Sequence, residues 1–172
     1  MSFRNRGDEL GLPKRKPQRL KGYDYSKNNA YFVTICTQNR AHLFGKIVDA
    51  AFTANTAGKM VEKCLLNISK PSVITIDKYV IMPNHVHIII LISNSGTTQG
   101  SFPTVSELLQ RFKTITTKLY IDGVKESVFL PFDKKIWQKS FHDHIIRNED
   151  EYQKTWQYID ENPLRWAEDE YF

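Results

Sequence analysis

The sequence predicts one α+β domain in which a four-stranded antiparallel sheet carries packed helices. Two observations lead to this prediction. Four segments are rich in β-branched and aromatic residues over the length of a strand, and three longer segments repeat apolar residues at helical spacing. With 172 residues, of which 41% are hydrophobic, the chain can bury one core without disulfides, so we expect a single domain over residues 23–172.

A strand and a helix open the predicted domain. Residues 31–37 are apolar and β-branched and lie between asparagine-containing turns, which is typical of a strand. Apolar residues then recur at helical spacing from about Thr53 to Ser69, and Pro71 follows. Because proline cannot continue a helix, this pattern predicts an amphipathic helix that ends just before it.

The next two strands form a predicted antiparallel hairpin, in which residues 73–82 and 85–92 are joined by a Pro-Asn turn. Side chains alternate between the faces of a strand, so His85 and His87 should point the same way. The opposite face of that strand would bury Val86, Ile88, Ile90 and Ile92. Two adjacent imidazoles suit a divalent metal, although two histidines in a strand can equally serve only as hydrogen-bonding groups.

A capping box at Thr104 and Glu107 predicts the start of the second helix, and Gly123 marks its expected end. The face expected to be buried consists of Val105, Leu108, Leu109, Phe112, Ile115 and Leu119. The other face carries candidates for contact with a phosphate backbone, namely Arg111, Lys113 and Lys118. Basic residues are common on solvated helix surfaces, so each of the three can also simply face water.

A fourth strand is predicted within residues 136–146, and Asn148 is the expected N-cap of a last helix that runs to Pro163. The stripe of this helix expected to be buried consists of Tyr152, Trp156 and Ile159. Tyr158 lies to one side of the stripe, and Asn162 projects from the same flank one turn later. A phenol and an amide should therefore face outward together, although a rim tyrosine and a helix-ending asparagine are commoner roles.

The predicted order of elements is β-α-β-β-α-β-α. Helices interleaved with four strands in this order are typical of a ferredoxin-like, or RRM-like, sheet with the helices on one face. The other face of the sheet, or its edge, would then be free for a ligand.

Positive charge is concentrated at the start of the chain. Residues 1–22 hold seven basic and two acidic side chains, a net +5 that equals the charge of the whole protein, whereas residues 149–172 carry a net −6. Prolines and glycines indicate that this basic N-terminal arm is flexible. Either it is a solvated surface or it contacts a polyanion, in which case the contacting residues would be Lys14, Arg15, Lys16, Arg19 and Lys21.

Compartment and redox state can also be inferred. The sequence contains no apolar run as long as a membrane span, and the first residues lack the apolar core of a signal peptide. Cys36 and Cys64 lie inside predicted regular elements, which favours reduced core thiols over a disulfide framework. We therefore expect a cytoplasmic protein, associated with the nucleoid if its polyanion is DNA.

Three motifs occur in order along the chain. They are Tyr-Val-Ile-Met-Pro-Asn-His-Val-His at 79–87, Trp-Gln-Lys-Ser-Phe-His-Asp-His-Ile-Ile-Arg at 137–147 and Tyr-Ile-Asp-Glu-Asn-Pro at 158–163. Together they resemble the signatures of the REP-associated tyrosine transposases. That family is related to the single-tyrosine, IS200-like transposases of the HUH endonuclease superfamily.

The resemblance implies cleavage and rejoining of single-stranded DNA beside REP-type hairpins. It implies that Tyr158 is the nucleophile of a 5′-phosphotyrosine link, and that a divalent cation, Mg²⁺ or Mn²⁺, is held by His85, His87 and Asn162. It also favours a monomer over a dimer. A phenol with a pKa of about 10 attacks poorly at neutral pH, so a cation that neutralises and orients the scissile phosphate makes physical sense.

Two other functions stay open. A metal hydrolase with a His-x-His site would use activated water and form no covalent DNA adduct, but such sites are usual in longer barrel chains. A domesticated protein could instead bind DNA hairpins without turnover. His142 and His144 could approach a metal or DNA, but a structural role is the favoured interpretation.

Overall fold

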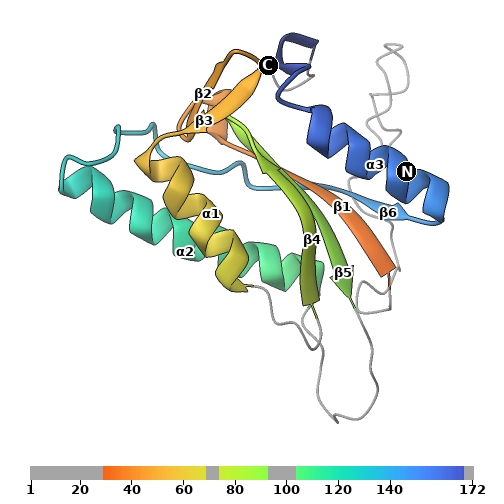
Figure 1. Cartoon of the computed structure of the whole chain (residues 1–172). Coiled ribbons are helices and arrows are strands. Elements are labelled where there is room, and N and C mark those ends of the chain that lie inside the picture. Colours follow the sequence, from red (N-terminus) through yellow and green to blue (C-terminus); the bar gives the residue numbers. More distant parts are fainter. Residues whose placement is uncertain (1–28, 69–73, 93–103, 169–172) are drawn as a thin grey trace, which may run out of the picture.

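The computed structural model describes residues 29–68, 74–92 and 104–168 (Figure 1). Its centre is a four-stranded antiparallel sheet in the order β4-β5-β1-β6. The strands are β1 (Asn29–Cys36), β4 (Ile74–Ile81), β5 (His85–Ile92) and β6 (His142–Ile146). The predicted α+β, ferredoxin-like fold is therefore confirmed. The basic N-terminal arm lies outside the described residues.

Helices cover both faces of the sheet rather than one. Figure 1 shows two helices together on one side and the third on the other; they are α1 (Thr56–Ile68), α2 (Val105–Lys125) and α3 (Glu149–Glu161). The expectation that the helices share one face is wrong because the second face also offers an apolar strip. Ile89 of β5 and Ile146 of β6 pack there against Ile159 of α3. Burying a side chain of this size contributes about 1.5–3 kcal/mol.

The side chains of β5 alternate between these two faces, as its sequence predicts. Its core-facing residues all belong to the main apolar cluster beneath α1 and α2, and they are Val86, Ile88, Ile90 and Ile92. His85 and His87 lie on the other face, together with Ile89. The predicted hairpin is also confirmed, since β4 and β5 pair antiparallel up to the contact of Ile81 with Val86.

A short hairpin between β1 and α1 was not predicted. Its strands, β2 (Gly45–Val48) and β3 (Ala51–Ala54), contain no buried residue, so they lack the apolar alternation by which a strand is recognised. The predicted first helix consequently starts too early. It begins at Thr56 because the side chain of Asn55 accepts a hydrogen bond of 2.8 Å from the amide of Gly58.

The helix α2 starts where its capping box predicts but ends later. Thr104 and Glu107 exchange backbone and side-chain hydrogen bonds of 2.7 and 3.2 Å. Gly123 does not end the helix, which continues to Lys125. A glycine is needed there for another reason, since a Cβ atom would lie 2.3 Å from the ring of Phe129.

The buried face of α2 also differs from the predicted one. Leu119 is 41% exposed, whereas Thr116 and Tyr120 are buried in its place. A threonine is tolerated in the core because its hydroxyl donates to the carbonyl of Phe112 and accepts from Nε1 of Trp137, at 2.8 and 2.9 Å. Thr116 therefore interrupts the apolar pattern of the sequence, although it lies on the buried face of α2.

The fourth strand is shorter than predicted. Residues 136–141 run beside the sheet with one isolated bridge, between Thr37 and Trp137, and regular pairing begins only at His142.

Both cysteines are free and buried, as expected for core thiols. None of the described helices is both long and apolar enough to cross a membrane.

Candidate metal and tyrosine site

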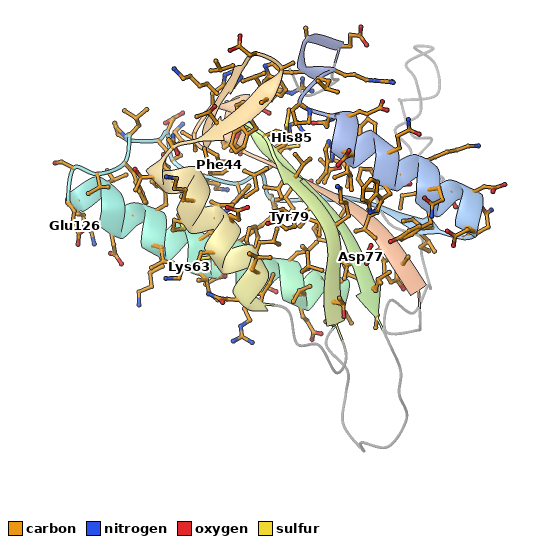
Figure 2. The ribbon with its side chains drawn as sticks, viewed as in Figure 1. Phe44, Lys63, Asp77, Tyr79, His85 and Glu126 are labelled. Carbon is orange, nitrogen blue, oxygen red and sulfur yellow. The ribbon has the colours of Figure 1, made fainter. Side chains whose placement is uncertain are left out.

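The two histidines of β5 lie side by side on the face that α3 covers. Figure 2 shows His85 at the end of β5 nearest the β2–β3 hairpin. His85 and His87 are at most 1% exposed, and their ring centroids are 4.5 Å apart. Such a buried pair of adjacent imidazoles is unusual as a purely structural feature, because each ring nitrogen then needs a partner.

Each histidine is oriented by one hydrogen bond at Nδ1. Nδ1 of His87 lies 2.8 Å from Oγ1 of Thr34, which is its direct partner across the β1–β5 ladder. Nδ1 of His85 lies 2.8 Å from Oδ1 of Asn84, in the turn before β5. A metal-binding histidine is commonly held through its second ring nitrogen in this way. In both rings Nε2 is then the atom that could bind a cation.

The electrostatic surroundings favour a neutral ring at His87. Burial, and secondarily the neighbouring His85, hold the pKa of His87 well below its usual range. The neutral imidazole is the form that coordinates metals, so no proton has to be displaced at neutral pH.

Tyr158 lies next to this pair. Its hydroxyl oxygen is 3.5 Å from Nε2 of His87, and the two ring centroids are 5.3 Å apart. Phe32 of β1 packs edge-on against the Tyr158 ring, at 5.9 Å and 88°, and so fixes the ring from the side of the sheet. The tyrosine is still 38% exposed. Its hydroxyl therefore contacts buried His87, while the side chain as a whole stays partly exposed to solvent.

Asn162 follows Tyr158 by one turn, as the C-cap of α3, and is buried. Both residues line a pocket of about 570 Å³, whose walls also include Phe32, Glu151, Lys154, Thr155, Arg165 and Glu168. The shared pocket agrees with the expectation that the phenol and the amide lie on one flank, but the expectation that both face outward is wrong, because Asn162 is buried. The amide oxygen of Asn162 is a suitable ligand for a divalent cation such as Mg²⁺.

The family of the chain follows from comparison with known proteins. The family model described as "Transposase IS200 like" matches residues 25–162. The chain belongs to the IS200-like transposases. It is 34% identical, over 94% of its own length and 95% of the relative's, to an uncharacterized protein of Haemophilus influenzae. Among solved structures, it is similar to a REP-associated tyrosine transposase bound to a REP hairpin, with a TM-score of 0.57 and 21% identity over 84% of this chain and 72% of that chain.

The buried stripe predicted for α3 of this IS200-like transposase is only partly correct. Ile159 is buried, but Trp156 is 38% exposed and Tyr152 only half-buried. Contacts with β4 help to hold the less buried part of the helix. Tyr152 donates to the carboxylate of Asp77, and the ammonium group of Lys78 lies 3.7 Å from the centre of the Trp156 ring.

Several site residues could not be predicted from local sequence. Thr34 and Phe32 reach the site only because β1 pairs with β5, and a strand partner is not readable from either strand alone. Trp166, in the short helix Trp166–Glu168, stacks on His85 at 5.9 Å and 27°. Its position beyond Pro163 carries no periodic signal. Asn84 was visible as a turn residue, but not as the partner of His85.

The described residues contain no cluster of three or more histidine, cysteine, aspartate or glutamate side chains suited to a metal. A cation at this site would therefore rest on the two imidazoles and an uncharged donor such as Asn162. Two other histidines were considered as possible contacts of a metal or DNA. His144 pairs through Nε2 with the carboxylate of Glu151, and His142 is exposed. The contact of His144 joins β6 to the first turn of α3, which fits a structural role.

The basic residues predicted on α2 do not adjoin Tyr158. Arg111, Lys113 and Lys118 lie on the helix that covers the other face of the sheet, and the first and last of them are exposed. Lys113 donates to the carbonyls of Gln138 and Ser140, both at 2.9 Å. Its ammonium group therefore holds the segment that follows α2 and is less available to DNA than the other two.

Proposed function

We propose that this IS200-like transposase cleaves and rejoins single-stranded DNA beside REP-type hairpins. In this proposal Tyr158 forms a 5′-phosphotyrosine link, and His85, His87 and Asn162 hold Mg²⁺ or Mn²⁺. The observation that carries the proposal is the 3.5 Å contact between the Tyr158 hydroxyl and Nε2 of buried His87. The similar REP-associated tyrosine transposase, bound to a REP hairpin, supports DNA hairpins as the partner.

The proposed reaction exchanges one phosphoester bond for another. The phenol oxygen of Tyr158 attacks the scissile phosphorus, its bond to the preceding 3′ oxygen breaks, and the phenol proton is lost while the 3′ oxygen gains one. Rejoining reverses these steps, when a 3′-hydroxyl attacks the phosphotyrosine and the phenol recovers its proton. The number of phosphoester bonds is unchanged, so joining needs no ATP.

The residues present fit a divalent cation. Two neutral imidazoles, each oriented through Nδ1, and one amide leave further positions for phosphate oxygens and water. Nitrogen ligands favour Mn²⁺ over Mg²⁺. When bound, such a cation neutralises charge on the phosphate and orients it for in-line attack.

Two cationic side chains of the pocket support a phosphate substrate. Arg165 pairs with Glu161 at 2.6 Å, so its charge is already partly balanced. Lys154 lies one helical turn before Tyr158 and lines the same pocket. From this position its ammonium group can donate a hydrogen bond to a phosphate oxygen of the bound strand. We extend the proposed DNA contacts to the basic N-terminal arm, and to Arg111 and Lys118 on α2.

The proposal is tested by incubating the full chain and Mn²⁺ with a labelled single strand that carries a REP-type hairpin. A denaturing gel should show a covalent protein–DNA band that EDTA prevents. Tyr158→Phe should abolish the band while hairpin affinity stays within a few-fold, because it removes one oxygen from a partly exposed ring. Tyr152→Phe is the matched control on the same helix and should keep the band. A band from Tyr158→Phe would refute the nucleophile assignment, as would its loss in Tyr152→Phe.

A further inference from the structure

A second groove, of about 860 Å³, lies between α2 and the segment that leads to β6. Its lining includes four buried residues of the main apolar cluster, Leu109, Ile136, Trp137 and Phe141. That cluster fills the face of the sheet beneath α1 and α2, whereas Phe32, which packs on Tyr158, belongs to the smaller cluster on the other face. The groove and the tyrosine pocket therefore lie on opposite sides of the sheet.

Six lysines are among the residues that line this groove, and we call it the lysine groove after Lys113, Lys118, Lys125, Lys134, Lys135 and Lys139. Asp122 is the one carboxylate among the lining residues, and it lies 3.7 Å from Lys125. No ion pair in the described part of the chain involves Lys118, Lys135 or Lys139, all of which are exposed. The groove thus carries a concentrated positive charge that the protein itself balances only in part.

The wall opposite α2 is held in a fixed shape. Lys113 of α2 donates to the carbonyls of Gln138 and Ser140, both at 2.9 Å, and so fastens the segment to the helix. Nε1 of Trp137 donates to Thr116 of α2 at 2.9 Å. These contacts use one lysine as a brace and leave the others on two facing walls. Such a preformed cleft avoids part of the ordering cost that a flexible lysine tail would have on binding.

We propose that the lysine groove binds the phosphate backbone of the DNA hairpin stem, and this inference rests on the proposed function. The chemistry of the groove suits a polyanion, because lysines supply charge, and Gln110 and Thr117 on the helix wall supply further hydrogen-bond donors to phosphate. The strand being cut must reach Tyr158 on the other side of the sheet. DNA in the lysine groove is therefore not the strand being cut. In a hairpin substrate the uncut part is the duplex stem.

The test compares two triple variants that remove the same charge. The groove variant is Lys118→Gln, Lys135→Gln and Lys139→Gln, which takes lysines from both walls and leaves the brace intact. The control variant is Lys46→Gln, Lys59→Gln and Lys63→Gln, three exposed lysines around β2 and α1, of which Lys63 is labelled in Figure 2. Both act on the full chain, with a DNA hairpin that has a duplex stem and an uncleavable single-stranded tail.

For the groove variant, the slope of log affinity against log salt should fall by about 2 to 3, since each phosphate contact contributes about 0.7 to 0.9. The control variant should change the slope by clearly less. Equal slopes in the two variants would overturn the proposal, and so would an equal loss of affinity for an unstructured single strand without a stem.

A separate reaction distinguishes failure of the lysine groove from failure of the proposed function. With a short single strand that lacks a stem, the groove variant at saturating DNA should form as much covalent band as the native chain. A loss of that band in the groove variant alone would contradict a role confined to the stem. If the native chain forms no band with the hairpin-bearing strand either, the nucleophile assignment fails, whereas the salt comparison still decides the groove.

Discussion

At the residue scale, the candidate site depends on side chains that hold the histidines rather than on the histidines alone. Thr34 lies directly opposite His87 in the β1–β5 ladder, and its hydroxyl is 2.8 Å from Nδ1 of that ring. Without this contact the ring could rotate, and Nε2 would no longer be directed toward the position that a cation would share with His85.

We therefore predict that Thr34→Val lowers the affinity for Mn²⁺ by about 10- to 100-fold, the range measured when partners of metal-binding histidines are removed. Valine keeps the shape and the strand preference of threonine, so the fold should be preserved. Calorimetric titration with Mn²⁺ measures the effect. Thr34→Ser should restore much of the affinity, and Thr75→Val, on an exposed position of β4, should leave it unchanged. Native-like affinity in Thr34→Val would show that the hydroxyl does not orient the ring.

At the element scale, α3 carries both Tyr158 and Asn162, yet Ile159 is its only buried residue before the C-cap. Polar contacts at both ends add to its attachment. Glu151 accepts from the backbone amide of Arg147 at 2.7 Å and from the ring of His144, and Lys78 pairs with Asp160 at 2.5 Å. The position of Tyr158, the proposed nucleophile, therefore depends on a helix that is held largely by surface pairs.

The contacts of Glu151 predict a pH dependence of stability. The amide of Arg147, and secondarily the ring of His144, lower the pKa of Glu151 from its ordinary value of 4.5. Because the folded-state pKa is depressed, the ionised carboxylate stabilises the fold above the ordinary value, and that contribution is lost as the pH falls through the folded value.

Glu151→Gln should accordingly lower the free energy of unfolding at pH 7 by no more than about 1 kcal/mol, as is usual for exposed pairs. The difference from the native chain should shrink as the pH falls below about 4. Urea titrations at several pH values measure this difference. Glu126→Gln, an exposed residue at the end of α2 that is labelled in Figure 2, should show no such trend. A constant difference across the pH range would mean that the ionised carboxylate is not what stabilises α3.

The elements that could be predicted are those with local signals. The capping box of Thr104 and Glu107 marks the start of α2, and strict alternation marks the two faces of β5. Signals of this kind are contained within a few residues. The β2–β3 hairpin has none, since its strands of four residues bury nothing. The buried residue Thr116 was missed because its polarity hides a core position that hydrogen bonds make acceptable.

The site was predicted to a similar extent. The motifs identify the histidine pair, Tyr158 and Asn162, and the structure puts Tyr158 against His87 and in one pocket with Asn162. The side chains that complete the surroundings come from strand pairing and from the end of the chain. Thr34 is 53 residues away from His87 along the chain, and Trp166 follows the last predicted element. Such long-range contacts depend on tertiary packing, which no local pattern specifies.

At the scale of the whole molecule, basic and acidic residues are separated along the chain. Residues 1–22 carry a net +5 and residues 149–172 a net −6. The second of these segments includes α3, where acidic residues outnumber Lys154 and Arg165, so most of the positive charge available to DNA lies in other parts of the chain. The basic N-terminal arm is the densest source of positive charge in the sequence.

We predict that neutralising Lys14, Arg15, Lys16, Arg19 and Lys21 together flattens the slope of log affinity against log salt by several units. Each phosphate contact contributes about 0.7 to 0.9 to that slope. Cleavage at saturating DNA should survive, because the arm is not part of the proposed metal and tyrosine site. Filter binding of a DNA hairpin over a range of salt concentrations gives the slope. An unchanged slope would assign the arm to solvent and leave the lysine groove as the main electrostatic contact.

The proposed covalent bond between Tyr158 and DNA can be located by mass spectrometry of the adduct. Trypsin should cut after Lys154 and after Arg165, and the released peptide, residues 155–165, contains Tyr158 as its single tyrosine. Tyr152 falls in the preceding peptide, residues 148–154. After reaction with hairpin DNA and Mn²⁺ and trimming by nuclease, we expect a nucleotide joined through its 5′ phosphate to Tyr158. A nucleotide on the peptide of residues 148–154, or on any residue other than Tyr158, would contradict it.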